Sequence, residues 1–431
     1  MTLEKKKKFP FSKLFCVHCL MYLGCTTGTY YYNATLTTIA STMKGDVVLA
    51  GLLASTYSLV AMFCRPIAGF MNEKFGRRRS NEWGLYGTIL SIVMMIIAKD
   101  MALLFAARVV AGISFSITSA ANYAAASDLA PEDNKALGIG WFQNMATFAS
   151  YIGPVVGVWG LNRYLATGSW TAFYVATLLT AVYSLILNFF IRYENKPEWK
   201  AKQAAMAEAR KHKEAIVEEG PELPPMKPFA GMTVPAWLLI LALALVAMAQ
   251  QSVGSFLLLC AQERGITALG SYFLLQTVGM FICKGFIAPQ IEKIGAFKVV
   301  LFAVVVAIVS YFMFSTATSI TPLLIIAPFY GCVWGTFPPV CNTLIVASVP
   351  GDRKGFASAM YLFGIDVGYG IGPTLWGFVI AAVGYARVYF VAMFLPILAF
   401  VLFCLYWFGW GKKIYAATQE WKKSRAAAVQ E

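Results

Sequence analysis

Charged residues are scarce in this sequence, and histidine is almost absent. Only 13% of the 431 residues are charged and two are histidine, whereas an ordinary soluble domain has about 25% charged residues. The sequence also lacks a nucleotide-binding glycine loop, a metal-ligand cluster and a Ser-His-Asp pattern, so we expect neither an enzyme nor a bound cofactor. A soluble protein this poor in charge would expose too much apolar surface to water. The composition therefore excludes a soluble enzyme, a disordered chain and a collagen-like fibre.

Apolar residues, in contrast, make up 59% of the chain. Twelve membrane-spanning helices of about 20 residues each would use about 240 of them, close to what the chain holds. We therefore predict an all-α integral membrane protein with twelve transmembrane helices in two pseudo-symmetric six-helix bundles. The predicted spans are residues 14–39, 47–69, 83–98, 102–125, 137–159, 171–192, 235–260, 269–289, 298–317, 321–347, 356–381 and 388–410.

The basic residues are distributed unequally between the two sides of this predicted topology. The net charge is +14, and 28 of the 35 Lys and Arg residues fall on the side of the N-terminus, against five on the opposite side. The positive-inside rule then places both termini in the cytoplasm of a multi-pass protein of the cell membrane. Because the basic residues are spread over every inner loop, we expect the lipid bilayer as a partner and no nucleic acid.

A polar segment interrupts the apolar pattern after the sixth span. Its first part, residues 200–219, is rich in Ala, Lys and Glu, which favour helix, and Gly220-Pro221 would end that helix. We predict an N-terminal bundle, a cytoplasmic linker with a helix, and a C-terminal bundle with a cytoplasmic tail, at residues 1–193, 194–232 and 233–431 respectively.

The second half of the sequence repeats the first at an offset of 219 residues. Such an internal repeat is typical of transporters, in which the substrate site lies near the membrane midplane where the repeats meet. The aligned pairs include Arg65 with Lys284, Glu73 with Glu292, Lys74 with Lys293, Gly76 with Gly295, Gly112 with Gly331, and Gly153-Pro154 with Gly372-Pro373.

The loop after the second span combines spaced glycines with acidic and basic residues. It reads Gly69-Phe70-Met71-Asn72-Glu73-Lys74-Phe75-Gly76-Arg77-Arg78 and resembles the signature loop of the major facilitator superfamily, with Glu73 in the place of the usual Asp. Glycine permits a tight turn and close backbone approach, and ion pairs that break and re-form can gate a conformational change. The predicted cytoplasmic gate consists of Gly69, Glu73, Lys74, Gly76, Arg77, Arg78, Asp128, Lys284, Glu292, Lys293 and Gly295.

Two further motifs carry the resemblance, which extends over essentially the whole chain. Leu104-x-x-x-Arg108-Val109-Val110-Ala111-Gly112 is similar to the family's helix-4 motif, whose Arg is linked in relatives to proton coupling or anion handling. The stretch around Gly153-Pro154 resembles the helix-5 motif of antiporters in this family, which implies export. The same Gly-Pro motif recurs in the second half, which indicates that it also serves to shape the helices. The predicted helix-bending residues are Gly153, Pro154, Gly157, Gly372 and Pro373.

Polar and aromatic residues on single faces of several predicted spans could line a substrate cavity. Each could instead bridge helices or pack, so both roles stay open. The predicted cavity residues are Tyr30, Asn33, Ser119, Asn122, Gln143, Asn144, Gln250, Gln251, Gln276, Asn342, Trp334 and Tyr361.

Asp366 is the only carboxylate well inside a predicted span. It lies about 15 Å from the start of that span, near the midplane, where a carboxyl group can serve as a reversible proton carrier. A structural hydrogen bond is the competing interpretation. Arg108 lies roughly 10 Å inside its own span, and we hypothesise that the two residues face the same cavity and sense each other.

These features predict a monomeric secondary transporter that moves a small organic substrate by alternating access, coupled to protons, in the direction of efflux. An uptake symporter or uniporter in which Arg108 holds an organic anion is the main alternative. A receptor or lipid-handling protein that does not transport is the third.

Overall fold

The computed structural model is helical almost throughout the part of the chain that it describes. Contacts divide the chain into two units, Met1–Gly45 with Thr56–Glu208 and Asp46–Ser55 with Ala209–Glu431. The predicted linker helix at 200–219 lies outside the described residues. The structure describes residues 12–44, 46–130, 135–195, 197, 199, 228–229, 232–266, 269–284, 294–350 and 353–428.

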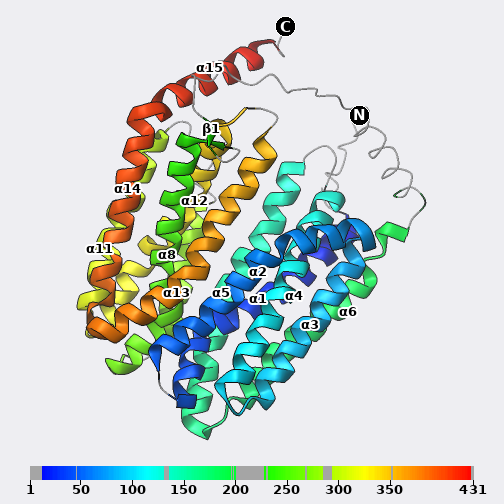
Figure 1. The fold of residues 1–431 in the computed structure, drawn as a ribbon, viewed down its shortest axis with the longest axis vertical. Coiled ribbons are helices and arrows are strands. Elements are labelled where there is room, and N and C mark those ends of the chain that lie inside the picture. Colours follow the sequence, from blue (N-terminus) through cyan, green and yellow to red (C-terminus); the bar gives the residue numbers. More distant parts are fainter. Residues whose placement is uncertain are drawn as a thin grey trace, which may run out of the picture. The chain divides into compact units, whose positions relative to one another are not determined.

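The first unit consists of long helices, coloured blue to green in Figure 1. Helix α1 packs against both α5 and α6, and α3 packs against α4. The beginning of α2, from Val47 to Ser55, belongs to the second unit. The elements are α1 (Lys13–Lys44), α2 (Val47–Phe75), α3 (Arg77–Ile97), α4 (Met101–Leu129), α5 (Lys135–Thr167), α6 (Thr171–Phe190) and the short 3-10 helix η2 (Tyr193–Asn195).

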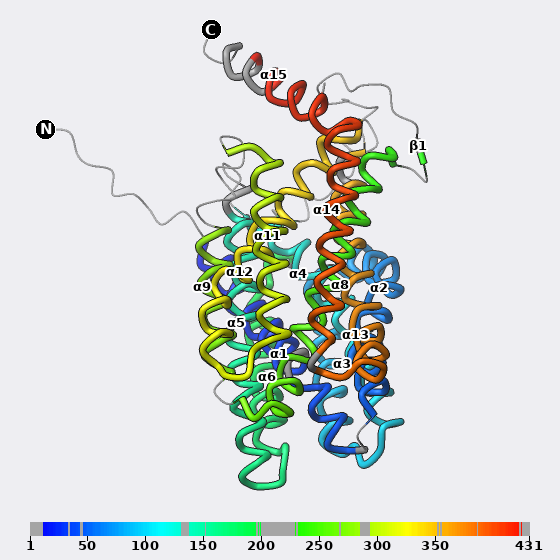
Figure 2. The backbone as a smooth tube through the Cα atoms, turned by 90° about the vertical axis from the view of Figure 1, so that its left-hand side faces the viewer, coloured from blue at the N-terminus to red at the C-terminus, as the bar shows by residue number. Residues whose placement is uncertain are grey.

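The second unit opens with a two-stranded antiparallel ribbon and continues in helices. Helix α8 packs against α13 and α14, and α9 packs against α12. Helix α14 runs through the π-helix η6 into α15, the red segment of Figure 2. The elements are β1 (Pro228–Phe229), β2 (Met232–Thr233), α8 (Val234–Glu263), α9 (Leu269–Ile282), α11 (Ala296–Thr316), α12 (Ile320–Ala347), α13 (Lys354–Ala392), α14 (Phe394–Tyr406), η6 (Trp407–Gly411) and α15 (Lys412–Ala428).

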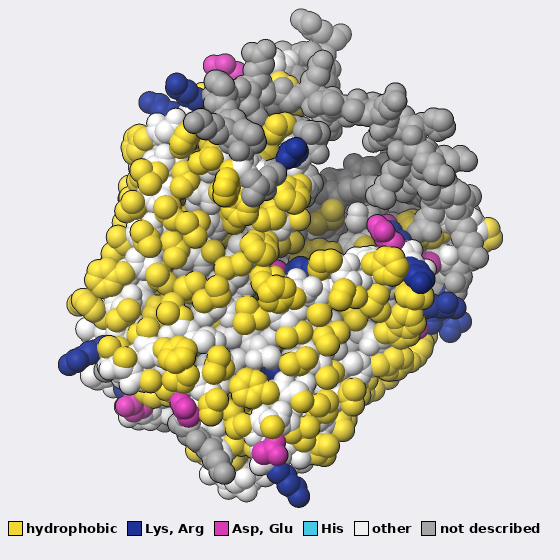
Figure 3. All heavy atoms as spheres, in the orientation of Figure 1, with side chains coloured by type: hydrophobic (Ala, Val, Ile, Leu, Met, Phe, Trp, Pro, Cys, Tyr) yellow, Lys and Arg dark blue, Asp and Glu magenta, His cyan; other side chains and the backbone are white. Residues whose placement is uncertain are grey.

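The surfaces of these helices are apolar. Among the described residues, eight helices are long and apolar enough to cross a membrane. Large hydrophobic side chains such as Phe63 and Phe408 are 73% and 74% exposed, which would promote aggregation in water but is favourable in lipid. Figure 3 shows hydrophobic side chains covering the sides of the helices, with most of the visible charged side chains toward their ends. The predicted all-α membrane fold is confirmed.

The helices extend beyond the apolar segments that predicted them. Helix α3 begins at Arg77 where 83 was expected, and α5 continues to Thr167 where the predicted span ended at 159. Helix α13 covers the predicted span 356–381 and, after a kink at Gly384 with φ +78°, the first residues of the last predicted span, which continues in α14 and η6. The end of the predicted span 269–289 lies outside the described residues after Lys284.

The repeat is visible in the backbone at matching positions. Gly76 and Gly295, which are 219 residues apart, precede α3 and α11 with φ of +84° and +93°, a conformation that a side chain would strain. Gly112 lies against the backbone carbonyl of Tyr57, and Gly331 lies against that of Gln276. Tyr57 and Gln276 are also 219 residues apart, so both units use the same close helix contact.

The predicted helix-bending motifs lie at close helix contacts as well. Pro154 lies inside α5 and Pro373 inside α13. A Cβ atom on Gly153 would collide with Tyr30 of α1, and one on Gly372 would lie 2.9 Å from Cβ of Gln251 in α8. Gly157 is buried. These small residues therefore let α5 approach α1 and let α13 approach α8.

Candidate functional site

The start of α3 is the centre of a polar cluster in the first unit. Gly76 turns the chain between α2 and α3, and Arg77 then reaches α4, where its Nε lies 3.0 Å from Oδ2 of Asp128. The side chains of this pair are 26% and 17% exposed. The ion pair therefore joins the beginning of α3 to the last turn of α4, two helices that pack against each other.

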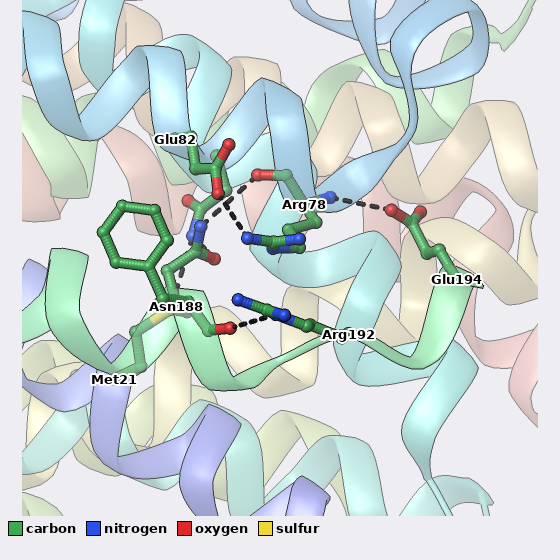
Figure 4. A network of polar contacts seen from close by, with 8 residues as sticks. Met21, Arg78, Glu82, Asn188, Arg192 and Glu194 are labelled. Carbon is green, nitrogen blue, oxygen red and sulfur yellow. Dashed lines mark hydrogen bonds and ion pairs between the residues drawn. The ribbon is translucent and has the colours of Figure 1, made fainter. Parts of the chain in front are cut away.

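A carboxylate from beyond α6 caps α3. Glu194 accepts hydrogen bonds from the backbone nitrogens of Arg77 and Arg78, at 2.7 and 3.1 Å. These nitrogens belong to the first turn, where amide groups lack helical partners and a negative charge is favourable. In Figure 4 the Glu194 side chain points at this turn. The cap fastens the segment after α6 to the start of α3.

An amide network, formed by Asn81, Asn122 and Asn188, is also bonded to the start of α3. Nδ2 of Asn81 donates to Oδ1 of Asn188 at 2.8 Å, and Nδ2 of Asn122 donates to Oδ1 of Asn81 at 3.1 Å. Asn188 donates in turn to the carbonyl of Arg78, and Nε2 of His18 donates to the carbonyl of Asn122 at 3.0 Å (Figure 4 shows part of this network). Four helices, α1, α3, α4 and α6, are therefore joined through buried polar atoms.

Asp128 has a second partner besides Arg77. The hydroxyl of Tyr193 donates to Oδ2 of Asp128 at 3.1 Å. Burial and the neighbouring negative charge of Asp128 raise the pKa of Tyr193 well above its usual value. The phenol therefore stays protonated at physiological pH and remains a hydrogen-bond donor to the carboxylate.

The predicted gate residues do not all take part in this cluster. Glu73 is exposed and forms no ion pair with any residue that the structure describes, whereas Glu82 pairs with Arg78 at 2.9 Å. The ammonium group of Lys74 lies over the rings of Phe70 and Phe75. Among the remaining predicted members, Gly69 is exposed, Lys284 is half-buried, Gly295 precedes α11, and Glu292 and Lys293 lie outside the described residues.

Arg108 also belongs to the first unit, but it is not part of the polar cluster at the start of α3. Its side chain is buried, with 3% of the residue exposed, and its guanidinium carbon lies 4.5 Å from the ring centre of Tyr57. It lines a cavity of about 40 Å³. Residues of α1, α2, α3, α4 and α6 form the walls, among them Thr29, Thr88 and Thr180. None of the predicted substrate-cavity residues is among the described residues that line this cavity.

The predicted cavity residues of the first unit have different surroundings. Asn122 belongs to the amide network, and Tyr30 lies against Gly153. The hydroxyl of Ser119 donates to the carbonyl of Ser116 in its own helix. Gln143 is exposed, Asn144 is half-buried, and the side chain of Asn33 is outside the described part.

In the second unit, several predicted cavity residues make side-chain contacts within their own helix or with a neighbouring one. Gln250 accepts a hydrogen bond from the hydroxyl of Tyr330 at 2.6 Å, and Gln251 accepts one from Ser255 at 3.1 Å. Trp334 stacks on Tyr369 with ring centres 5.8 Å apart. Three further members, Gln276, Asn342 and Tyr361, are half-buried.

Asp366 is half-buried in α13, inside the membrane-crossing segment Phe356–Tyr385. It belongs to the second unit, whereas Arg108 belongs to the first. That Asp366 and Arg108 face the same cavity and interact through their charges therefore stays a prediction.

Sequence analysis missed a residue that holds the second unit together. Arg264, directly after α8, donates from Nη1 to the carbonyls of Phe314 and Ala317 at 2.7 and 2.8 Å. Its Nη2 donates to the carbonyls of Ser315 and Tyr385 at 3.3 and 3.4 Å. Its acceptors are backbone atoms, which carry no residue-specific signal, so only the three-dimensional structure reveals this clamp.

Comparison with known proteins identifies a family model that matches most of the chain and relatives that match about a third of it. The family model described as Major Facilitator Superfamily matches residues 14–335 and 239–427. The chain is 28% identical over 145 residues to the class C tetracycline resistance protein of Escherichia coli, covering 34% of this chain and 35% of that protein. It is 29% identical over 141 residues to the arabinose-proton symporter of Escherichia coli strain K12, covering 33% and 29%.

A solved structure shares the fold over most of the chain. The human organic anion transporter MFSD10 superposes with a TM-score of 0.62 and 18% identity, covering 90% of this chain and 98% of that one. The alignments to the curated sequences are shorter, since the chain matches only about a third of the length of those relatives or less.

Proposed function

Because the chain belongs to the major facilitator superfamily, we propose that this multi-pass membrane transporter works as a proton-coupled exporter of a small organic molecule. In this proposal the protein is a monomer in the cell membrane with both termini in the cytoplasm. Transport proceeds by alternating access, in which the substrate site opens to one side of the membrane at a time.

The observation that carries the proton coupling is the position of Asp366. A charged carboxylate is expensive inside a bilayer, and such residues usually belong to ion or proton pathways. Asp366 lies ten residues after Phe356, where its membrane-crossing segment begins. Protonation would allow the side chain to be neutral in one state and charged in another, so its proton can alternate with substrate binding.

Two observations support the direction of transport. The Gly153-Pro154 motif of α5, which resembles that of antiporters, lies at a close contact with α1. The chain is also similar to a tetracycline resistance protein.

We propose that the cluster of Arg77, Asp128 and Glu194 acts as the cytoplasmic gate, whose contacts form and break during the cycle.

The main alternative is proton-coupled uptake, to which the similarity with an arabinose-proton symporter points. In the form of this alternative that uses an organic anion, Arg108 would hold the substrate. The cavity beside Arg108, at about 40 Å³, is small compared with the roughly 300–1,000 Å³ of typical ligand pockets. This comparison favours a role for Arg108 other than binding an organic substrate.

Reconstituted protein tests the proposal. Proteoliposomes with an imposed proton gradient would be supplied with a panel that contains a tetracycline, a pentose and an organic-anion dye. Substrate movement opposite to the proton flow supports export, and movement with the protons supports the alternative. Transport that does not respond to the proton gradient would refute the proposed proton coupling.

Asp366→Asn identifies the proton carrier. We expect proton-driven accumulation to fall at least tenfold, roughly the effect of losing 1.4 kcal/mol of coupling, while downhill exchange of substrate continues. The control is Asp100→Asn, because Asp100 is exposed and its Oδ1 caps Leu103 at the start of α4, which Asn can also do. Normal proton-driven transport by the Asp366→Asn protein would refute the assignment.

A further inference from the structure

The cavity beside Arg108 contains a positive charge without a negative partner. Its lining includes Tyr32, Tyr57 and Arg108, together with hydroxyl and apolar side chains, and contains no Asp or Glu. Among the described residues, no carboxylate lies within ion-pair distance of Arg108. A buried guanidinium keeps its proton under ordinary conditions, so the charge has to be balanced by something in the cavity.

The face of Tyr57 offsets only part of this charge. The guanidinium carbon of Arg108 lies 4.5 Å from the ring centre, a cation–π contact that is strongest when it is desolvated. The penalty for burying an ion without a partner exceeds what one such contact contributes. The ring therefore stabilises the arginine but does not replace a counter-ion.

The polar atoms that face the cavity include hydrogen-bond donors. Nε of Arg108 is buried without a hydrogen-bond partner among the described residues. The hydroxyls of Tyr32 and Tyr57, which lie beside Thr177 and Thr29, are buried phenols that can each donate one hydrogen bond. The smaller hydroxyls are already in use, since Thr88 and Thr180 donate to carbonyls of their own helices. A cluster that offers donors and a positive charge, with no carboxylate, is complementary to an anion.

The size of the cavity limits what the anion can be. At about 40 Å³, the space accommodates a few water-sized groups and excludes an organic acid of drug size. Water molecules alone could satisfy the donors, but they would leave the charge uncompensated.

We propose that the first unit binds a small inorganic anion, of the size of chloride, between Arg108 and the hydroxyls of Tyr32 and Tyr57. This anion is a resident counter-ion that stabilises the packing of α1, α2, α3, α4 and α6 around the cavity. The inference concerns the first unit alone and holds whether the protein exports, imports or does not transport.

Halide-dependent stability tests the proposal on the purified full-length protein in detergent. The thermal midpoint would be measured while sodium chloride or sodium bromide replaces sodium gluconate at constant ionic strength and pH. Because a ligand that binds only the folded state stabilises it, we expect the midpoint to rise with halide and to saturate. If the midpoint does not depend on halide, the cavity contains only water, and the proposal is overturned.

Variants locate the site. Arg108→Gln should remove the halide dependence, and Tyr57→Phe, which keeps the ring beneath the guanidinium, should raise the half-saturating halide concentration about threefold to tenfold. The control is Tyr86→Phe, because Tyr86 is a 48% exposed residue of α3 that does not line the cavity. Equal halide dependence in wild type, Tyr57→Phe and Tyr32→Phe would also refute the site.

A second measurement is independent of stability, in case Arg108→Gln does not fold. Crystals of the wild-type protein soaked in sodium bromide should show an anomalous peak beside Arg108, and Tyr57→Phe crystals a weaker one. Absence of the peak from well-ordered wild-type crystals in saturating bromide would overturn the assignment.

Discussion

Asp128 illustrates how one side chain can fasten several parts of a bundle. It accepts from Arg77 of α3 and from Tyr193 beyond α6, while it belongs itself to α4. The pair with Arg77 is partly exposed, so its net contribution to stability is about 1 kcal/mol or less. Contacts of that strength can be broken by a modest change in binding energy, which suits a gate better than a fixed structural element.

Replacing this carboxylate should affect transport more than folding. Asp128→Asn removes the charge opposite Arg77 but keeps an oxygen that can accept from Tyr193. We expect a fall of up to about 1 kcal/mol in the free energy of unfolding, together with a severalfold change in the transport rate in proteoliposomes.

The comparison variant is Glu82→Gln, which breaks the pair with Arg78 inside one helix, where such pairs contribute about 0.3–0.5 kcal/mol. If Glu82→Gln altered the rate as much as Asp128→Asn, the contact between helices would have no special role as a gate.

Local sequence patterns indicated some of the contacts that the structure contains, whereas contacts between segments far apart in the sequence left no pattern. The spaced glycines and arginines of the loop after α2 are adjacent in sequence, and the structure places Gly76 at the turn and Arg77 in an ion pair. Glu194 lies 117 residues from Arg77, with no pattern that connects them. The sequence instead favoured Glu73, which is adjacent but exposed.

At the scale of elements, hydropathy located the helices but not their ends. It detects the apolar middle of a span, whereas a helix continues until its backbone is capped or turned. The start of α3 therefore depends on Gly76 and the cap from Glu194, six residues before the apolar pattern begins. Polar residues also continue α5 as far as Thr167.

A very close helix contact in the second unit joins α9 to α12. A Cβ atom on Gly279 would collide with the carbonyl of Pro328, and one on Gly331 would collide with that of Gln276. Because these neighbours are backbone atoms, the helices themselves would have to separate. We expect Gly279→Ala and Gly331→Ala each to destabilise the protein by about 1–3 kcal/mol or more, seen as a lower thermal midpoint in detergent.

Gly270 provides the matched control within α9, because a Cβ atom there would meet nothing within 4 Å. Gly270→Ala should leave the midpoint within a degree or two of wild type. If all three variants behaved alike, close packing of α9 on α12 would not be the cause.

At the scale of the whole molecule, the internal repeat was the most informative signal. A constant offset relates segments by their place in the fold, so it predicted equivalent glycines whose shared conformation and contacts the structure then shows, at Gly76 with Gly295 and at Gly112 with Gly331. Polar residues on helix faces were less informative, because a buried amide such as Asn122 or Gln250 can join helices as well as line a cavity.

The distribution of basic residues makes a prediction for the molecule as a whole. In a bacterial host, alkaline phosphatase fused at Gly168, between α5 and α6, should be active, and the same enzyme fused at Ser424 in α15 should be inactive. Fluorescent protein fusions should give the reverse pattern. The reasons are the positive-inside rule and the need of the phosphatase for an oxidising compartment. The opposite result at both positions would invert the proposed topology.

The clamp formed by Arg264 has a consequence for biosynthesis. Arg264 precedes all of its acceptors in the chain, at Phe314, Ser315, Ala317 and Tyr385. During synthesis, about fifty more residues must therefore be added after Arg264 before its first acceptor exists, and about 120 before its last acceptor exists. Until α13 has been inserted, this end of the second unit is held by a partial set of bonds, so a nascent chain that stops before Tyr385 should be the form that quality-control proteases recognise.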